Sequence, residues 1–247
     1  MPVIQVFKRV EKKYMLDKAL FDELYPFLLE HMSEDVYGLH TICNVYYDTV
    51  DCELIRTSIE KPPYKEKFRI RSYGTPKEDD TVFLEIKKKC KGVVYKRRIP
   101  LVYRQALALI DNITEGGKLY GNDISDYSGL DSFSDIQIMH EIEYIINHYK
   151  LIPATYIAYD RIALFGIDNP ELRITFDRNV RTRDTDLSLA SGDYGELILE
   201  EDKYIMEIKT NGAMPMWLVN KLSAINLYPY SFSKYGTAHK RKIMGVQ

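Results

Sequence analysis

Several short segments of this chain carry charged residues at every second position, and this pattern restricts what the chain can fold into. The clearest examples are Phe68–Arg71, Leu84–Lys87, Arg173–Asp177 and Met206–Lys209. Successive side chains of a β-strand point to opposite faces, so each segment separates its charged residues from its apolar ones. The pattern predicts strands whose charged faces are rich in Arg and Lys, with a carboxylate beside the cation in three of the four segments.

These charged faces allow two interpretations. In an ordinary half-buried strand the charged face is turned to water. If the strands instead close into a barrel with that face inward, they line a cationic tunnel that holds a few acids. A tunnel of that kind is suited to a polyanion and its metal ion.

Composition excludes several classes of function. A chain of 247 residues with 45% apolar residues can bury a substantial core, and its net charge of -2 argues against a general nucleic-acid coat. Cys43, Cys52 and Cys90 form no CxxC pair, so neither a disulfide framework nor a zinc site is indicated. There is no signal-peptide pattern and no run of about 20 apolar residues, so we expect a cytoplasmic protein without a membrane span.

The order of the predicted elements indicates an α+β fold. Helices are expected at 17–32, 51–60, 101–113, 136–149 and 215–226, the first of them kinked or divided by Pro26. Strands are expected at 6–14, 41–48, 65–73, 81–89, 92–100, 155–165, 171–178, 195–199 and 203–210. Strands grouped as a meander favour an antiparallel sheet. We expect one domain, residues 1–247, with a flexible insertion at about 114–134 and a frayed C-terminus.

A series of short motifs, taken in order, resembles a known family. They are Glu11–Tyr14, Tyr46–Thr49, Arg69–Gly74, Leu84–Lys87, Lys96–Arg98, Tyr159–Ala163, Arg173–Asp177, Glu207–Lys209 and Ser233–Tyr235. Together they are similar to the polyphosphate polymerase domain of the vacuolar transporter chaperone (VTC) family, within the CYTH-like triphosphate tunnel metalloenzymes. The resemblance runs from about residue 5 to residue 240.

The resemblance implies a fold and an activity. The implied fold is an eight-stranded antiparallel β tunnel, closed as a barrel, with helices packed outside. The implied enzyme is a phosphotransferase that moves the γ-phosphate of ATP onto a growing inorganic polyphosphate chain, with Mn²⁺ or Mg²⁺. The expected partners are therefore ATP and polyphosphate rather than nucleic acid, and a membrane partner protein is left open.

The resemblance also implies roles for individual residues. The catalytic cations would be Lys13, Arg69, Arg71, Lys87, Arg161, Arg173, Lys209 and Lys234. Further phosphate contacts would come from Lys96, Arg98 and Ser233. Glu207 would be the metal ligand, and Glu85 and Glu11 would be assisting acids.

One departure from the family's hydrolytic relatives bears on the reaction. Those relatives open with two glutamates and a lysine at alternate positions, whereas this chain has Arg9, Glu11 and Lys13. A metal site there loses a hard oxygen ligand and the tunnel gains a cation. This favours the polymerase branch over the triphosphatases.

The chemistry agrees with these residue types. Phosphoryl transfer requires in-line positioning and neutralisation of charge on the transferred group. Arg69 and Arg71 lie two residues apart on one strand, roughly 7 Å, which suits neighbouring phosphates. Glu207 beside Lys209 would hold a metal against the same phosphates. The accepting phosphate oxygen is already ionised, so no strong general base is needed.

Three other functions stay open. They are a tunnel triphosphatase that hydrolyses tripolyphosphate or a nucleoside triphosphate, a polyphosphate-binding protein without turnover, and a sheet-based RNA-binding module. Simpler roles stay open for single residues too. Glu207 could only pair with Lys209, Ser233 could cap the backbone, and Tyr46 could belong to packing.

Overall fold

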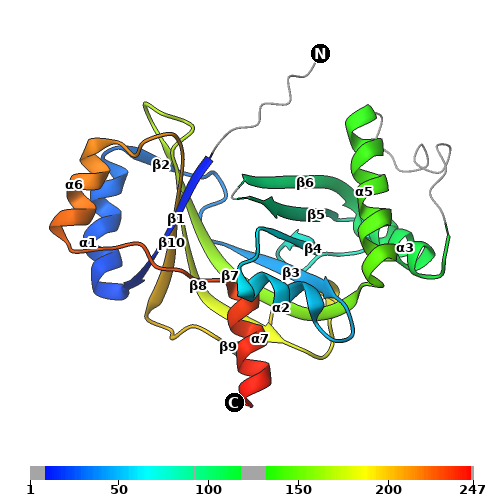
Figure 1. Cartoon of the computed structure of the whole chain (residues 1–247). Coiled ribbons are helices and arrows are strands. Elements are labelled where there is room, and N and C mark those ends of the chain that lie inside the picture. Colours follow the sequence, from blue (N-terminus) through cyan, green and yellow to red (C-terminus); the bar gives the residue numbers. More distant parts are fainter. Residues whose placement is uncertain (1–8, 92, 118–131, 246–247) are drawn as a thin grey trace. The chain divides into compact units, whose positions relative to one another are not determined.

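A computed structural model describes residues 9–91, 93–117 and 132–245. The chain divides into two compact units (Figure 1). Unit 1 comprises Met1–Thr41, Tyr159–Val180 and Leu197–Ser233, and unit 2 comprises Ile42–Ala158, Arg181–Glu196 and Lys234–Gln247. The predicted insertion at 114–134 falls mostly on residues 118–131, which lie outside the described residues.

The fold combines one sheet with helices. The strands are β1 (Arg9–Asp17), β2 (Met32–Glu34), β3 (His40–Asp48), β4 (Tyr64–Tyr73), β5 (Thr81–Cys90), β6 (Val93–Val102), β7 (Ile152–Gly166), β8 (Arg173–Arg183), β9 (Glu196–Leu197) and β10 (Lys203–Asn211). The helices are α1 (Lys18–Leu29), α2 (Glu53–Glu60), α3 (Tyr103–Thr114), α5 (Phe133–Tyr149), α6 (Met216–Ala224) and α7 (Lys234–Met244), with a short 3-10 turn at Leu189–Ser191.

The strand order in the ten-stranded sheet is β1-β10-β8-β7-β3-β4-β5-β6, with β2 added to β7 and β9 to β8. The registers of β1 with β10, β10 with β8, and β3 through β6 are all antiparallel. The predicted class, an α+β protein built on an antiparallel sheet, is confirmed. Closure of the sheet into a tunnel stays a prediction.

In unit 1 the apolar faces of β1, β8 and β10 pack against α1 and α6. The core includes Tyr14, Leu16, Leu24, Leu28, Ile174, Phe176, Met206, Ile208, Leu218 and Leu222. Helix α1 begins at Asp17, whose Oδ1 accepts a hydrogen bond from the Leu20 backbone N–H at 2.9 Å. Pro26 lies inside α1 and does not divide it. Because helices cover the apolar face, the charged residues of these strands lie on the opposite face.

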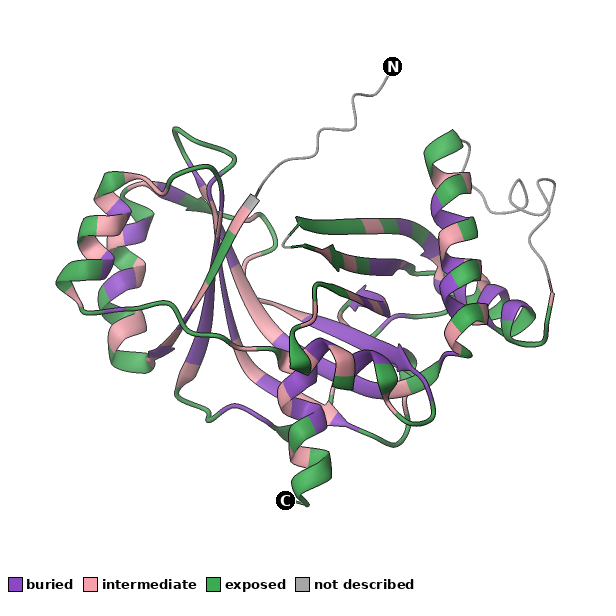
Figure 2. Ribbon diagram, in the orientation of Figure 1, coloured by how far each residue is buried: buried purple, intermediate pink, exposed green. Residues whose placement is uncertain are grey.

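Unit 2 repeats this arrangement with α3 and α5. Its core includes Phe68, Ile70, Leu84, Ile86 and Ile99 from the strands and Leu109, Ile110, Ile142 and Ile145 from the helices. Burying one such side chain contributes about 2 kcal/mol. Helix α5 starts at a capping box formed by Ser132 and Asp135, and it carries both buried and exposed residues (Figure 2).

Three local features differ from the sequence prediction. The first helix ends at Leu29, and Met32–Glu34 form a short strand on β7. Strand β9 is only Glu196–Leu197. The expected frayed C-terminus is wrong, because Lys234–Met244 form α7. That helix has few apolar residues, but it buries Tyr235, Gly236, Ala238 and His239 along one side.

Candidate functional site

Unit 2 carries a row of polar side chains across four neighbouring strands. Arg69 of β4 lies opposite both Tyr46 of β3 and Glu85 of β5. Glu85 in turn lies opposite Arg98 of β6. Side chains that lie directly opposite each other on antiparallel strands have Cβ atoms about 5 Å apart. The alternation in the sequence and the register of the strands therefore gather these residues on one face.

Glu85 lies at the centre of the cations on this face. Arg69 donates from Nε and Nη2 to Glu85 Oε2 at 2.8 and 2.6 Å. The Lys96 Nζ lies 2.7 Å from Oε1, the Arg71 Nε lies 3.7 Å from Oε2 and the Arg98 Nη1 lies 4.0 Å from Oε1. We name these five residues the Glu85 cluster. One carboxylate faces four cations, so the cluster keeps an excess of positive charge.

The charge state of Glu85 follows from these neighbours. Glu85 is only 2% exposed, and burial alone would raise the pKa of its carboxyl group. The charges of Arg69, Arg71 and Lys96 outweigh that effect and hold the pKa of Glu85 well below its ordinary value. Burial lowers the pKa of Lys96 to about 8, with Arg71 and Arg69 adding to the shift and Glu85 opposing it.

Other polar residues hold the two arginines in place. Arg69 Nη1 donates to the Tyr46 hydroxyl at 2.6 Å, and Arg71 Nε donates to Asn44 Oδ1 at 3.0 Å. The Tyr46 ring stacks on Tyr235 of α7, with ring centroids 4.5 Å apart. Side chains of β3 therefore hold the two arginines in place, and α7 packs against one of those side chains.

The support from α7 depends on Asp48, which is fully buried. The Tyr235 hydroxyl donates to Asp48 Oδ2 at 2.8 Å. The same carboxylate accepts hydrogen bonds from the Leu54 and Ile55 backbone N–H groups of α2, at 2.8 and 3.0 Å. Asp48 thus ties α2, β3 and α7 together, on the same face of β3 as Tyr46 and Asn44.

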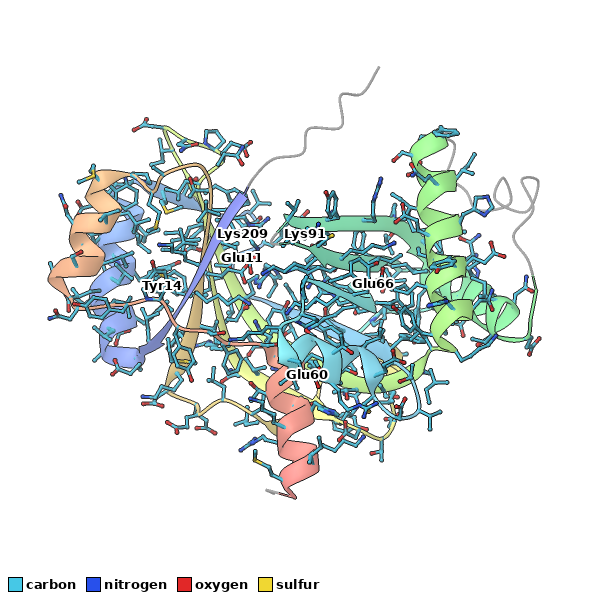
Figure 3. All side chains as sticks on the ribbon, viewed as in Figure 1. Glu11, Tyr14, Glu60, Glu66, Lys91 and Lys209 are labelled. Atoms are coloured by element: carbon cyan, nitrogen blue, oxygen red, sulfur yellow. The ribbon has the colours of Figure 1, made fainter. Side chains whose placement is uncertain are left out.

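Unit 1 carries a second cluster, on β1 and β10. Glu11 lies opposite Lys209, and Lys13 lies opposite Glu207 (Figure 3 labels Glu11 and Lys209). The Lys13 Nζ is 3.7 Å from both Glu11 Oε1 and Glu207 Oε2, and Lys209 forms an ion pair with Glu207 Oε1. We name these four residues the lysine–glutamate cluster. Its charges alternate along and across the strands, so they balance.

The two predicted arginines of unit 1 have different surroundings. Arg173 lies opposite Lys209 in the register of β8 and β10. Arg161 donates from Nε and Nη2 to the two oxygens of Asp177 at 2.6 and 2.8 Å. Burial alone would lower the pKa of Arg161, but the charge of Asp177 raises it. This bidentate pair is a framework contact that a bound phosphate would have to share.

The segment before α7 lies beside the lysine–glutamate cluster. Lys13 Nζ donates to the Phe232 carbonyl at 3.2 Å, and the Tyr230 N–H donates to the Lys13 carbonyl at 2.7 Å. Ser233 follows directly and is exposed, and Lys234 is the first residue of α7 in unit 2. The structure therefore places Ser233 next to the unit 1 cluster.

A divalent metal is implied by the family resemblance, so we tested whether the residues suit one. Among the residues that the structure describes, no three His, Cys, Asp or Glu side chains are grouped to hold a metal ion. The lysine–glutamate cluster offers two carboxylates on adjacent strands, Glu11 and Glu207. Mg²⁺ is commonly held by one or two carboxylates together with waters and substrate phosphates. The donor set is therefore adequate for such a metal once a phosphate supplies further oxygens.

The predicted residues fall into two groups. Unit 1 holds Glu11, Lys13, Arg161, Arg173, Glu207, Lys209 and Ser233, and unit 2 holds Arg69, Arg71, Glu85, Lys87, Lys96, Arg98 and Lys234. Sequence reasoning missed Lys67, which shares the charged face and lies two residues before Arg69. The alternation itself could have identified it. Tyr46, expected to belong to packing, is buried and stacks on Tyr235, and it also accepts a hydrogen bond from Arg69.

Comparison with known proteins places the chain in a family. The family model described as the VTC domain matches residues 8–242. A search of curated proteins found no match. In the described part of the chain, no helix is both long and apolar enough to cross a membrane.

Several solved structures resemble this one. The candidate adenylyl cyclase HpAC1 from Hippeastrum, for which a dominant triphosphatase activity is reported, has a TM-score of 0.54 at 15% identity, covering 94% of this chain and 95% of that one. A candidate adenylate cyclase from Vibrio parahaemolyticus has a TM-score of 0.48 at 11% identity, covering 94% and 98%. PH1819 from Pyrococcus horikoshii has a TM-score of 0.43 at 13% identity, covering 95% and 99%. The likeness to HpAC1 shows a shared fold, and the match to the family model shows that the chain belongs to the VTC domain family.

Proposed function

We propose that this protein is a metal-dependent polyphosphate polymerase, which transfers the γ-phosphate of ATP onto a growing inorganic polyphosphate chain. The single observation that carries the proposal is the excess of positive charge in the Glu85 cluster. Membership in the VTC domain family supports the same assignment.

The Glu85 cluster has the properties that phosphoryl transfer requires. The protein must hold the phosphates in line and neutralise the charge that spreads over the transferred group. Arg69 and Arg71 are fixed in direction by Glu85, Tyr46 and Asn44, so their forks need little reorganisation when a phosphate binds. Preorganised donors of this kind stabilise developing charge most effectively.

The lysine–glutamate cluster would hold the metal. Glu207, with Glu11 beside it, would hold Mn²⁺ or Mg²⁺ after Lys13 and Lys209 turn toward phosphate oxygens. The bound cation would neutralise charge on those oxygens. The acceptor is an ionised phosphate oxygen, so no residue has to remove a proton from it.

Hydrolysis is the second candidate function. It is favoured by the likeness of this fold to HpAC1, for which a dominant triphosphatase activity is reported. A triphosphatase must activate a water molecule, which requires carboxylates with free basic oxygens. In this chain, the oxygens of Glu207 face Lys13 and Lys209. Of the three alternate residues Arg9, Glu11 and Lys13 of β1, the first is an arginine where the hydrolytic relatives have a glutamate. This further favours transfer to a phosphate over transfer to water.

The test is incubation of the purified protein with γ-labelled ATP and Mn²⁺, followed by separation of the products on a gel. We expect a ladder of labelled polyphosphate together with ADP. Glu207→Gln should abolish the ladder, whereas Glu200→Gln, a control in an exposed turn, should leave it unchanged.

Two results would contradict the polymerase. Release of orthophosphate alone would assign the triphosphatase. Unchanged ATP, with or without a short polyphosphate primer, would assign a binding protein without turnover. The binding protein would still show tight and salt-sensitive anion binding.

A further inference from the structure

Helix α7 carries a buried histidine that the proposed function does not use. His239 is 6% exposed, and its Nε2 is buried with no hydrogen-bond partner among the described residues. Tyr235 lies four residues earlier, so the two side chains share one side of α7, one turn apart. Helix α7 also packs against α2 (Figure 1). His239 therefore lies beside the contacts that Tyr235 makes with Tyr46 and Asp48.

Four charged groups act on His239. They are Asp48 of β3, Arg56 of α2, Asp184 directly after β8 and Lys242 of α7 itself. Asp48 is fully buried, whereas the other three are exposed. The two exposed cations already have acid partners, because Arg56 pairs with Asp51 and the Lys242 Nζ lies 3.7 Å from Asp184 Oδ2. A proton on His239 therefore adds a positive charge that these pairs do not compensate.

The surroundings of His239 favour its neutral form. Burial lowers the pKa of its imidazole, and Lys242 and Arg56 add to the shift, whereas Asp48 and Asp184 oppose it. A histidine in water takes up a proton below about pH 6.5, whereas the buried His239 resists protonation until the pH is lower. Between those two pH values, packing of α7 requires that His239 release its proton. The packing should therefore weaken as the pH falls below about 6.5.

The Asp48 carboxylate is already fully engaged. Its two oxygens accept four hydrogen bonds, from the backbone N–H groups of Thr49, Leu54 and Ile55 at 2.9, 2.8 and 3.0 Å and from the Tyr235 hydroxyl at 2.8 Å. A carboxylate offers about four lone-pair sites, so these bonds fill them. Three of the donors belong to the backbone at the start of α2, whereas the Tyr235 hydroxyl belongs to a side chain that can turn. Asp48 can accept a bond from a protonated His239 most readily by giving up Tyr235.

From these contacts we infer that His239 is a positioning residue, whose protonation loosens Arg69 through Tyr235 and Tyr46. A proton on His239 either leaves a buried charge without a counter-charge or draws Asp48 away from Tyr235. In both cases Tyr235 holds Tyr46 less firmly, and Tyr46 accepts the Arg69 Nη1 hydrogen bond at 2.6 Å. Phosphate binding at the Glu85 cluster should then weaken below about pH 6.5. The inference rests on the proposed function only for the role of Arg69 in phosphate binding.

The first test follows the packing of α7 by amide hydrogen exchange, without any ligand. Wild-type protein is compared with His239→Gln at pH 7.5 and again at pH 5.5, so the effect of pH on exchange itself cancels. The ratio of wild-type to variant exchange rates for the α7 amides should rise by up to about tenfold at pH 5.5. That factor is the excess of the protonated form one pH unit below a pKa of about 6.5. His140→Gln, at an exposed position of α5, is the matched control and should exchange like the wild type.

The second test measures the affinity for tripolyphosphate by calorimetry at the same two pH values. The ratio of wild-type to His239→Gln affinity should fall about threefold from pH 7.5 to pH 5.5. This is less than the loss of one hydrogen bond to a charged group, because Tyr46 keeps its own bond to Arg69. In a Tyr235→Phe background, adding His239→Gln should leave the pH dependence of the affinity unchanged, since the effect passes through the Tyr235 hydroxyl.

Three results would overturn the inference. These are equal pH dependence of the wild type and His239→Gln in either measurement, the same change with His140→Gln, or a full effect of His239→Gln in the Tyr235→Phe background. If His239→Gln does not fold, His239→Leu gives the same comparison with an apolar side chain that suits a buried position. If tripolyphosphate binds at neither pH, the proposed function fails. Hydrogen exchange needs no ligand and would still decide whether His239 controls the packing of α7.

Discussion

The two charged clusters come from the same sequence pattern but differ in the balance of their charges. On β1 and β10, two lysines and two glutamates alternate, and each glutamate contacts at least one ammonium group. In the Glu85 cluster one carboxylate faces four cations. A balanced cluster can release a carboxylate to a metal when phosphate arrives to pair with its lysines. An unbalanced cluster is already prepared for an anion.

The acids of the two clusters also differ in burial, and the acid that faces the most cations is the most deeply buried. The Glu85 side chain is 2% exposed, whereas the Glu207 and Glu11 side chains are 10% and 33% exposed. Glu85 and Glu207 both have cations at each oxygen, but Glu85 is the more deeply buried and faces more of them. We therefore expect Glu85 to position the arginines, and we expect a metal to be bound by Glu207 and Glu11.

The largest expected effect comes from removing the charge of Glu85. Glu85→Gln leaves Arg69 and Arg71 close together without their counter-charge, and loss of one partner from a buried pair costs about 3 kcal/mol. The free energy of unfolding, measured with urea, should fall by about that amount. Tripolyphosphate should restore more stability to this variant than to the wild type, because it supplies the missing negative charge.

Glu207→Gln is the corresponding substitution in the lysine–glutamate cluster, and its effect on stability should be smaller. Its lysine partners are about 30% exposed, so its cost in stability should be about 1 kcal/mol or less. If Glu207→Gln destabilised the protein as much as Glu85→Gln, the proposed difference between the two acids would be wrong. That difference is that Glu85 holds the arginines in place, whereas Glu207 can be given up to a metal.

The second prediction concerns the metal. At a fixed concentration of free Mn²⁺, we expect wild-type affinity for tripolyphosphate to rise about tenfold over the metal-free value, the size of one contact to a charged group. Glu207→Gln should abolish this rise. Glu85→Gln should keep it, since Glu85 makes its contacts with cations rather than with a metal. Calorimetric titrations with and without Mn²⁺ measure the ratio directly.

A metal effect that disappears with Glu85→Gln and survives Glu207→Gln would reverse the two assignments. Glu200→Gln serves as the control, because it removes an equal charge in an exposed turn. Its titrations should match those of the wild type at every metal concentration.

The sequence was sufficient for most of the strands and for the face on which their charged residues lie. Alternation over Phe68–Arg71 and Leu84–Lys87 is a local pattern with a period of two, and it places a charge on a known face whatever the partner strand is. The register that sets Arg69 opposite Glu85 is not local. It depends on the pairing of β4 with β5, so the grouping of cations around Glu85 required the structure.

The supporting residues could not be predicted for the same reason. Tyr46 reads as an apolar strand residue, and only the contacts with Arg69 and Tyr235 show its role. Helix α7 was missed because its sequence is polar and its stability comes from packing its buried side against α2. Contacts across 187 positions, as between Asp48 and Tyr235, leave no local pattern.

The third prediction tests that support. Tyr46→Phe removes the acceptor for Arg69 Nη1 and should cost about 1 kcal/mol, a loss of roughly fivefold in affinity for tripolyphosphate. Tyr47→Phe is the matched control, because Tyr47 is the next residue on β3 and packs on the opposite face, against Phe68. Equal effects of the two substitutions, measured by calorimetry, would show that Tyr46 acts only through packing.

The smallest effect should come from pH, through Lys96. Its pKa is lowered to about 8, so the ammonium group keeps its charge below that pH and loses it above. A bound phosphate favours the charged form, so affinity for tripolyphosphate should fall as the pH rises from 8 to 10. Nearly half of the Lys96 side chain is exposed, which limits the fall to about two- or threefold. Lys96→Arg keeps its charge throughout this range, so this two- or threefold fall should appear as a change in the ratio of wild-type to Lys96→Arg affinity between pH 8 and pH 10. Since tripolyphosphate is the ligand in both titrations, its own ionisation cancels from the comparison. An identical decline in the wild type and in Lys96→Arg would place the titrating group outside the Glu85 cluster.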